Sequence, residues 1–227
     1  MRSGGVLAFV RGDLRQRIKL VVSDLNGTWV ADCAQVHESV CAVFRDFSVR
    51  EPSLEEYRLR CGISRNPTAF YRQLGIPFFV SSEEIVERFR THIRMRPPAP
   101  PSEGARELFE ALRYFGHPAA LVTLLNIDAL ERDRRRFDLG HYFPAGIYGG
   151  LREKATTLMD LRRRFRCDPG ELLFVSDTYR DLVQANAVDC FTIGVGNGHG
   201  LPKTLKDARP KLVVASLREL QETLEMK

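Results

Sequence analysis

The chain has 227 residues, of which 44% are apolar and 28% charged, and its formal net charge is +5. This length and apolar content allow one substantial hydrophobic core with a small second domain, and they exclude a disordered or fibrous chain. No apolar run approaches the roughly 18–20 residues of a membrane-spanning helix. Residues 4–10 are too short for a secretory signal. We therefore expect a cytoplasmic protein without a membrane partner.

The spacing of the cysteines and the distribution of the basic residues indicate which partners the protein can have. The five cysteines contain no CxxC pair, which argues against a disulfide framework. The basic residues are spread over predicted helices with acidic residues between them, and no interleaved basic and aromatic motif occurs. We therefore expect no nucleic-acid partner, and a solvated helical surface that favours a small anionic substrate. A monomer and a homodimer are both compatible with the sequence.

The first predicted strand follows a basic N-terminal extension, residues 1–17, which shows no clear periodicity. Residues 18–22 form a short β-branched run that stops at Ser23 and Asp24, as a buried parallel strand does. The spacing then becomes helical, and we expect helices from about residue 35 to 47 and over 53–60, 67–74 and 82–94, the last capped at Ser82. The proline-rich residues 97–101 form a stiff linker that ends this helical insert.

Helices and strands alternate after the linker. We expect helices over 102–115, 127–137, 154–165 and 179–186, and strands over 119–123, 172–176, 190–194 and 211–214. The alternation predicts an α/β fold, a doubly wound parallel sheet with helices on both faces. Ligands of such sheets bind beyond the carboxyl ends of the strands. Asp24, Thr123 and Asp177 each end or follow a predicted strand, so we expect them to converge on one functional edge.

Four ordered motifs occupy these strand ends. Asp-Leu-Asn-Gly-Thr begins at Asp24, Thr123 closes the second strand, Lys154 comes third, and Ser-Asp-Thr-Tyr-Arg-Asp carries Asp177 and Asp181. In this order they resemble the motifs of the haloacid dehalogenase-like hydrolase superfamily, on its phosphoglycolate phosphatase-like branch. The resemblance implies a Rossmann-like core, residues 18–30 and 100–227, with an inserted all-helical cap domain, residues 31–99.

The resemblance also implies a phosphatase of a small phosphorylated metabolite, with Mg²⁺ as the cofactor. Asp24 would be the nucleophile that forms an aspartyl phosphate. Cations and hydrogen-bond donors must neutralise the phosphoryl oxygens before a carboxylate can attack. The implied Mg²⁺ ligands are Asp24, the backbone carbonyl of Asn26, Asp177 and Asp181, the last as a ligand or a support. The implied phosphate contacts are Thr123, Lys154, and the loop with Gly27 and Thr28.

Three further residues are candidates for substrate binding. Arg60 and Arg65 flank a glycine between two predicted helices of the cap, so they could reach the core site and bind a second anionic group. Asn126 lies three residues after Thr123, where it is a plausible helix cap and a weak substrate contact.

Asn26 departs from the pattern of the resemblance. Phosphatases of this superfamily have a second Asp here, which protonates the leaving alcohol and then activates water. An amide cannot do this, and such catalysis contributes on the order of 10²–10⁴ in rate. Alkyl phosphates should therefore be poor substrates, whereas acyl or aryl phosphates remain chemically accessible.

The same residue keeps other functions open. A catalytically impaired phosphate-binding or regulatory protein is the main alternative. A dehalogenase is less favoured, because dehalogenases of this superfamily carry an aromatic residue at the position of Asn26. Phosphonate cleavage is also less favoured, because it requires a lysine in the cap and the insert has none. Asn26 could also be a deliberate substitution for Asp, and an Asn-Gly pair is prone to deamidation.

Overall fold

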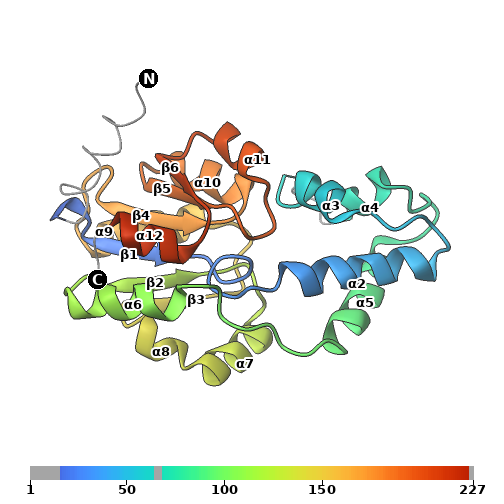
Figure 1. Ribbon diagram of the computed structural model, residues 1–227, viewed down its shortest axis with the longest axis horizontal. Helices are drawn as coiled ribbons and strands as arrows, with labels where there is room; N and C mark the ends of the chain where they lie inside the picture. The colour runs from blue at the N-terminus through green and yellow to red at the C-terminus, as the bar shows by residue number, and fades with distance from the viewer. Residues whose placement is uncertain (1–15, 64–67, 225–227) are drawn as a thin grey trace.

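A computed structural model describes residues 16–63 and 68–224 (Figure 1). Within these residues, six parallel strands form one sheet in the order β3-β2-β1-β4-β5-β6. The strands are β1 (Leu20–Ser23), β2 (Ala119–Val122), β3 (Gly146–Tyr148), β4 (Leu172–Ser176), β5 (Phe191–Val195) and β6 (Leu212–Val214). The first strand of the chain therefore lies at the centre of the sheet.

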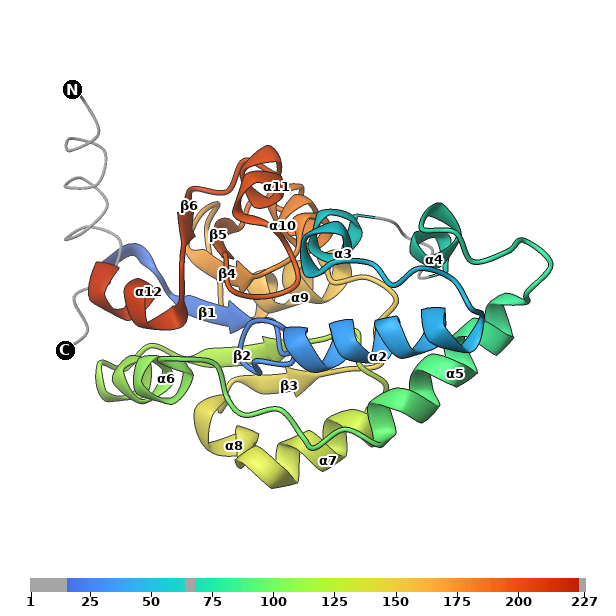
Figure 2. The same ribbon diagram turned by 45° about the vertical axis from the view of Figure 1, so that its right-hand side comes forward.

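Helices cover both faces of the sheet (Figure 2). Alternate residues of β1 point to opposite faces, Val21 to one and Leu20 with Val22 to the other. The face with Val21 packs against α6 (Ala105–Tyr114), α7 (Ile127–Phe137), α8 (Leu139–Tyr142) and α12 (Leu217–Thr223). The opposite face packs against α9 (Ala155–Arg164) and α10 (Tyr179–Asn186), with α11 (Pro202–Asp207) on α10. Because both faces are buried, β1 reads as a continuous apolar run.

A helical insert lies between β1 and β2, beyond the carboxyl ends of the strands (Figure 2). It consists of α2 (Cys33–Asp46), α3 (Leu54–Arg60), α4 (Ala69–Gln73) and α5 (Ser82–Arg94). These helices share an apolar cluster of their own, which includes Phe44, Phe70 and Ile85. The two chain segments that join the insert to the sheet pair with each other, since Ala31 N donates to Pro100 O at 2.9 Å.

The predicted α/β fold, with its doubly wound parallel sheet and helical insert, is confirmed. Several boundaries differ. The first strand begins at Leu20 and the first insert helix at Cys33. The helix expected from residue 102 begins at Ala105, after Gly104 with a φ of +78°, and α5 is capped by Ser81 instead of Ser82.

Four short elements were not predicted: β3, α8, α11 and α12. Of the predicted N-terminal extension, residues 1–15 lie outside the described residues. No helix in the described part of the chain is long and apolar enough to cross a membrane.

Candidate active site

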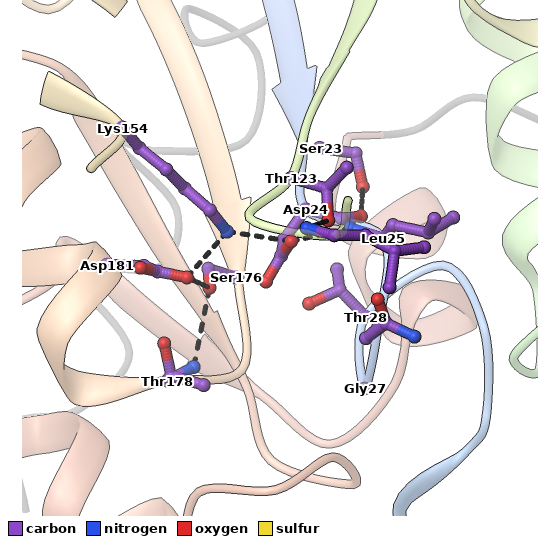
Figure 3. A network of polar contacts seen from close by, with 12 residues as sticks. Ser23, Asp24, Leu25, Gly27, Thr28, Thr123, Lys154, Ser176, Thr178 and Asp181 are labelled. Carbon is purple, nitrogen blue, oxygen red and sulfur yellow. Dashed lines mark hydrogen bonds and ion pairs between the residues drawn. The ribbon is translucent and has the colours of Figure 1, made fainter. Parts of the chain in front are cut away.

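The site is built around Asp24, which directly follows the central strand β1 (Figure 3). The backbone N–H of Asp24 donates to Val175 O at 3.0 Å, which ties the residue to the neighbouring strand β4. Its Oδ1 accepts a hydrogen bond from Leu25 N at 2.7 Å and forms an ion pair with Lys154 Nζ at 2.7 Å. The sheet thus fixes a buried carboxylate at its carboxyl edge.

Lys154 lies just before α9 and is 1% exposed. Its Nζ contacts Asp24 Oδ1 at 2.7 Å and Asp181 Oδ2 at 2.6 Å, so one ammonium bridges two buried carboxylates (Figure 3). Its backbone N–H donates to Gln184 Oε1 at 2.7 Å, which anchors the residue to α10. Asp181 also accepts a bond from Ser176 Oγ at 3.4 Å.

Asp177 follows β4 and is fully buried. Its Oδ1 accepts from Thr28 Oγ1 at 3.0 Å and its Oδ2 from the backbone N–H of His199 at 2.6 Å. Gly27 packs directly on this carboxylate with a φ of +73°, and an added Cβ would collide with Asp177 Oδ2. The loop after the central strand therefore requires glycine at position 27.

The charges of the site favour a bound cation. Burial raises the pKa of Asp24 to about 7, against the lowering effect of Lys154, and the carboxylates of Asp181 and Asp177 add to the rise. Burial alone would lower the pKa of Lys154, but the charges of Asp181 and Asp24 raise it, so the ammonium stays protonated. Lys154 therefore balances the charge of only part of this group, because Asp24 and Asp181 share its ammonium and Asp177 adds a third buried carboxylate near Asp24.

Among the described residues, no group of three His, Cys, Asp or Glu side chains is arranged to hold a metal by side chains alone. Mg²⁺ does not require such a group, because it retains several waters and accepts backbone carbonyls as ligands. The carboxylates of Asp24 and Asp177, with the carbonyl of Asn26 between them in the chain, give an all-oxygen donor set. This donor set and the excess of buried negative charge fit Mg²⁺.

A cavity of about 200 Å³ opens beside these groups, although Asp177 itself does not line it. The predicted residues that line it are Asp24, Asn26, Thr123, Lys154 and Asp181. The cavity is also lined by residues that were not among the predicted site residues, namely Gly62, Leu124, Leu125, Thr178, Arg180 and His199.

Other predicted site residues lie elsewhere. Arg60 donates to Glu56 O of its own helix at 3.4 Å and does not line the cavity. Asn126 caps α7, because its Oδ1 accepts from Ala129 N at 3.0 Å. The hydroxyl of Thr28 is turned to Asp177. Arg65 lies outside the described residues.

Asp32 and His199 form a further part of the site that the sequence did not indicate. Asp32 Oδ2 accepts from Asn26 Nδ2 at 2.7 Å, and its Oδ1 contacts Gly27 N at 2.8 Å and His199 Nε2 at 3.0 Å. The other ring nitrogen of His199 contacts the hydroxyl of Tyr57, on α3 of the insert, at 2.7 Å. The glycine-rich run around His199 after a predicted strand was the available signal.

These contacts set the charges of Asp32 and His199. Burial raises the pKa of Asp32, but the hydrogen bond and charge of His199 outweigh it, and the pKa is lowered. Burial lowers the pKa of His199, but the hydrogen bond that the ring donates to Asp32 and the charge of Asp177 raise it well above its ordinary value. The two side chains therefore form a buried ion pair beside the cavity.

The insert and the sheet meet at the loop that carries His199. Arg58 donates from Nη2 to the carbonyls of Gly196 and Gly200, at 2.5 and 2.8 Å. The backbone N–H of Arg180 donates to Gly62 O at 3.2 Å, and both residues line the cavity. The insert thus closes over the carboxylate site.

Comparisons with known proteins agree with this architecture. A family model described as HAD-hydrolase-like matches residues 153–220. A phosphoglycolate phosphatase of Neisseria meningitidis is 29% identical over 146 residues, which are 60% of this chain and 60% of that protein. A phosphoglycolate phosphatase of Haemophilus influenzae is 21% identical and covers 93% of this chain and 100% of its own length.

Solved structures share the fold. A conserved haloacid dehalogenase-like protein from Agrobacterium tumefaciens superposes with a TM-score of 0.75 at 17% identity, over 92% of this chain and 98% of its own. A putative phosphoglycolate phosphatase from Lactobacillus delbrueckii gives a TM-score of 0.74 at 17% identity, over 91% and 98%. The fold and site together define a capped Rossmann-like protein with an aspartate at the end of its central strand. These matches make the chain similar to haloacid dehalogenase-like hydrolases, among them proteins named phosphoglycolate phosphatase.

Proposed function

We propose that this protein is a Mg²⁺-dependent phosphatase of small phosphorylated metabolites that acts through an aspartyl phosphate on Asp24. The observation that carries this proposal is the buried Asp24 carboxylate at the cavity, held by Lys154 at 2.7 Å. The relatives named phosphoglycolate phosphatase support a small phosphorylated acid as the substrate class.

The hydrogen bonds of Asp24 leave one of its oxygens available for attack. Within the described residues, the contacts from Leu25 N and Lys154 Nζ both fall on Oδ1. Oδ2 can therefore attack phosphorus, forming the acyl phosphate while the bond to the leaving-group oxygen breaks. Water then cleaves the acyl phosphate, which releases inorganic phosphate and restores the carboxylate. Lys154 keeps the carboxylate oriented and offers its charge to the phosphoryl oxygens.

Mg²⁺ would be held by Asp24, the backbone carbonyl of Asn26 and Asp177, and it would supply the positive charge that a phosphoryl group needs to approach a carboxylate. Asp181 would act as a support, because its Oδ2 is already engaged by Lys154. Thr123 lines the cavity, and its hydroxyl accepts from Leu125 N at 3.2 Å, which leaves the hydroxyl proton for a phosphate oxygen.

The insert, residues 31–99, would act as the cap that excludes water from this reaction. Its contacts through Tyr57, Arg58 and Gly62 to the sheet side of the cavity support this role. The Asn26 amide has no acidic proton to give to a leaving group, so the preferred substrates would be acyl or aryl phosphates.

The test is phosphate release from acetyl phosphate and p-nitrophenyl phosphate, with and without Mg²⁺, by the parent chain and by Asp24→Ala. We expect Mg²⁺-dependent turnover that Asp24→Ala abolishes. Turnover that survives in Asp24→Ala would refute the aspartyl phosphate mechanism.

The second candidate is a phosphate-binding or regulatory protein, and the observation that favours it is Asn26 itself. Phosphate binding without turnover of either substrate would support this candidate against the phosphatase.

A further inference from the structure

Asp32 occupies the N-cap position of α2 but does not cap the helix. Aspartate is among the preferred N-cap residues because its side chain accepts from the first free N–H groups of a helix. Here the side chain makes no cap hydrogen bond. Its carboxylate points instead to the active-site loop, where it contacts Asn26 Nδ2, Gly27 N and His199 Nε2 at 2.7, 2.8 and 3.0 Å.

This contact determines which end of the Asn26 amide enters the cavity. Gly27 N is necessarily a donor, and an ionised carboxylate only accepts hydrogen bonds. The Asn26 side chain must therefore turn its Nδ2 to Asp32, which directs its Oδ1 away from Asp32. Asn26 lines the cavity, so the group it can offer there is a hydrogen-bond acceptor.

Asp32 is itself held in place from the far side. His199 Nε2 contacts Asp32 Oδ1, while His199 Nδ1 is engaged by Tyr57 at 2.7 Å. Both Asp32 and His199 are buried. The orientation of Asn26 is thus fixed by a chain of contacts that begins on the cap helix α3.

We infer that Asp32 is a positioning residue for Asn26, and that positions 26 and 32 form a reciprocal pair in which the carboxylate at 32 requires the amide at 26. The inference rests on the proposed phosphatase function and deepens it. The fixed Oδ1 gives the leaving group an acceptor and no proton, which selects substrates whose leaving group departs unaided.

The contact between positions 26 and 32 determines the outcome of Asn26→Asp. An aspartate at position 26 would face the Asp32 carboxylate at hydrogen-bond distance. An aspartate has no side-chain N–H to donate to Asp32, so the hydrogen bond that orients the side chain at position 26 is lost and the two carboxylates repel each other. The family's usual acid is therefore not restored by the single change, but by the exchange Asn26→Asp with Asp32→Asn.

The kinetic test compares the parent, Asn26→Asp, Asp32→Asn and the double variant on acetyl phosphate and on phosphoglycolate, an alkyl phosphate. We expect Asn26→Asp alone to stay near the parent on phosphoglycolate, and the double variant to gain on the order of 10²–10⁴ in kcat. On acetyl phosphate the gain should be small, since this leaving group needs no proton. Equal turnover of phosphoglycolate by Asn26→Asp and the double variant would overturn the reciprocal pair.

A second measurement does not depend on activity. Deamidation of an Asn-Gly pair begins when the glycine nitrogen attacks the asparagine Cγ and ammonia leaves. Asp32 holds both reacting groups, through Gly27 N and Asn26 Nδ2. Asp32→Ala should therefore speed deamidation of Asn26 by on the order of tenfold, the effect of losing a hydrogen bond to a charged group.

Intact mass and peptide mapping follow this rate, with Asp46→Ala, a cap carboxylate paired with His92, as the matched control. Asp32→Asn, which preserves the side-chain size, replaces the alanine variant if that variant does not fold. An unchanged deamidation rate would overturn the positioning role. If no variant, including the parent, turns over acetyl phosphate, the phosphatase proposal fails and the deamidation rate alone decides whether Asp32 positions Asn26.

Discussion

Lys154→Met should destabilise the protein strongly and in a pH-dependent manner. The substitution keeps the length of the side chain but removes the ammonium between Asp24 and Asp181, at 2.7 and 2.6 Å. Removing one partner of a buried ion pair typically costs about 3–5 kcal/mol, because the other charge is left buried. For a protein of this size that corresponds to a fall in melting temperature of roughly 10 °C.

The pH dependence follows from the carboxylates left behind. The pKa of Asp24 is already raised to about 7 by burial, and the loss of Lys154 raises it further. A carboxyl group whose folded pKa lies above its unfolded value stabilises the fold below the unfolded pKa, and this contribution is lost as the pH rises through the folded pKa. The deficit of Lys154→Met relative to the parent should therefore be smaller at about pH 5 than at about pH 8.

The assay is urea unfolding of the parent and Lys154→Met at both pH values, with metal ions chelated and the free energy extrapolated to water. Lys19→Met is the matched control, because Lys19 forms an equally short ion pair with Glu171, at 2.6 Å, but on an exposed surface. That control should change the unfolding midpoint little. A stable Lys154→Met protein, or a deficit that does not shrink at the lower pH, would refute the electrostatic account.

Three further predictions concern the cavity and its loops. Arg180 lines the cavity, so Arg180→Gln should raise the KM for phosphoglycolate on the order of tenfold by removing a charged hydrogen bond to the substrate carboxylate, and it should leave acetyl phosphate turnover unchanged. Arg60→Gln, outside the cavity, should change neither value. Gly27→Ala should lower the free energy of unfolding by about 1–3 kcal/mol, because residue 27 has a positive φ. It should also abolish phosphate release by displacing Asp177, and normal kinetics would contradict this packing. Burial lowers the pKa of His199, but its carboxylate neighbours raise the pKa by more, so the folded pKa lies above the unfolded value. The extra stability of the parent relative to His199→Gln should therefore be complete below about pH 6.5 and should be lost as the pH rises through the folded pKa. A pH-independent difference between their metal-free melting temperatures would contradict this sign.

The positions of the site carboxylates could largely be predicted, because the ends of the buried strands can be recognised in the sequence. Asp24 and Asp177 each follow a short apolar run, and parallel strands place their carboxyl ends on one edge. Lys154 was placed by its position among ordered motifs, and the structure brings it between Asp24 and Asp181.

The contacts of Asp32 were not predictable in the same way. Asp32 and His199 are far apart in the chain and share no periodic pattern, and an Asp before a helix is ordinarily explained as a cap. The unpredicted elements are short, and β3, a three-residue edge strand, is only partly buried. Short, partly buried segments leave too little hydrophobic pattern to distinguish a strand from a loop.

The central position of β1 has a consequence for how the protein forms. Val21 pairs with Ala119 on one side and Leu173 on the other, so the strand made early in synthesis has its first partner only once residue 119 exists and its second only once residue 173 exists. Parallel sheets with such distant pairings fold slowly and leave apolar strands exposed meanwhile. Asp24 therefore meets Lys154 and Asp177 only late in folding, when the insert has already been synthesised and its own apolar cluster can be complete.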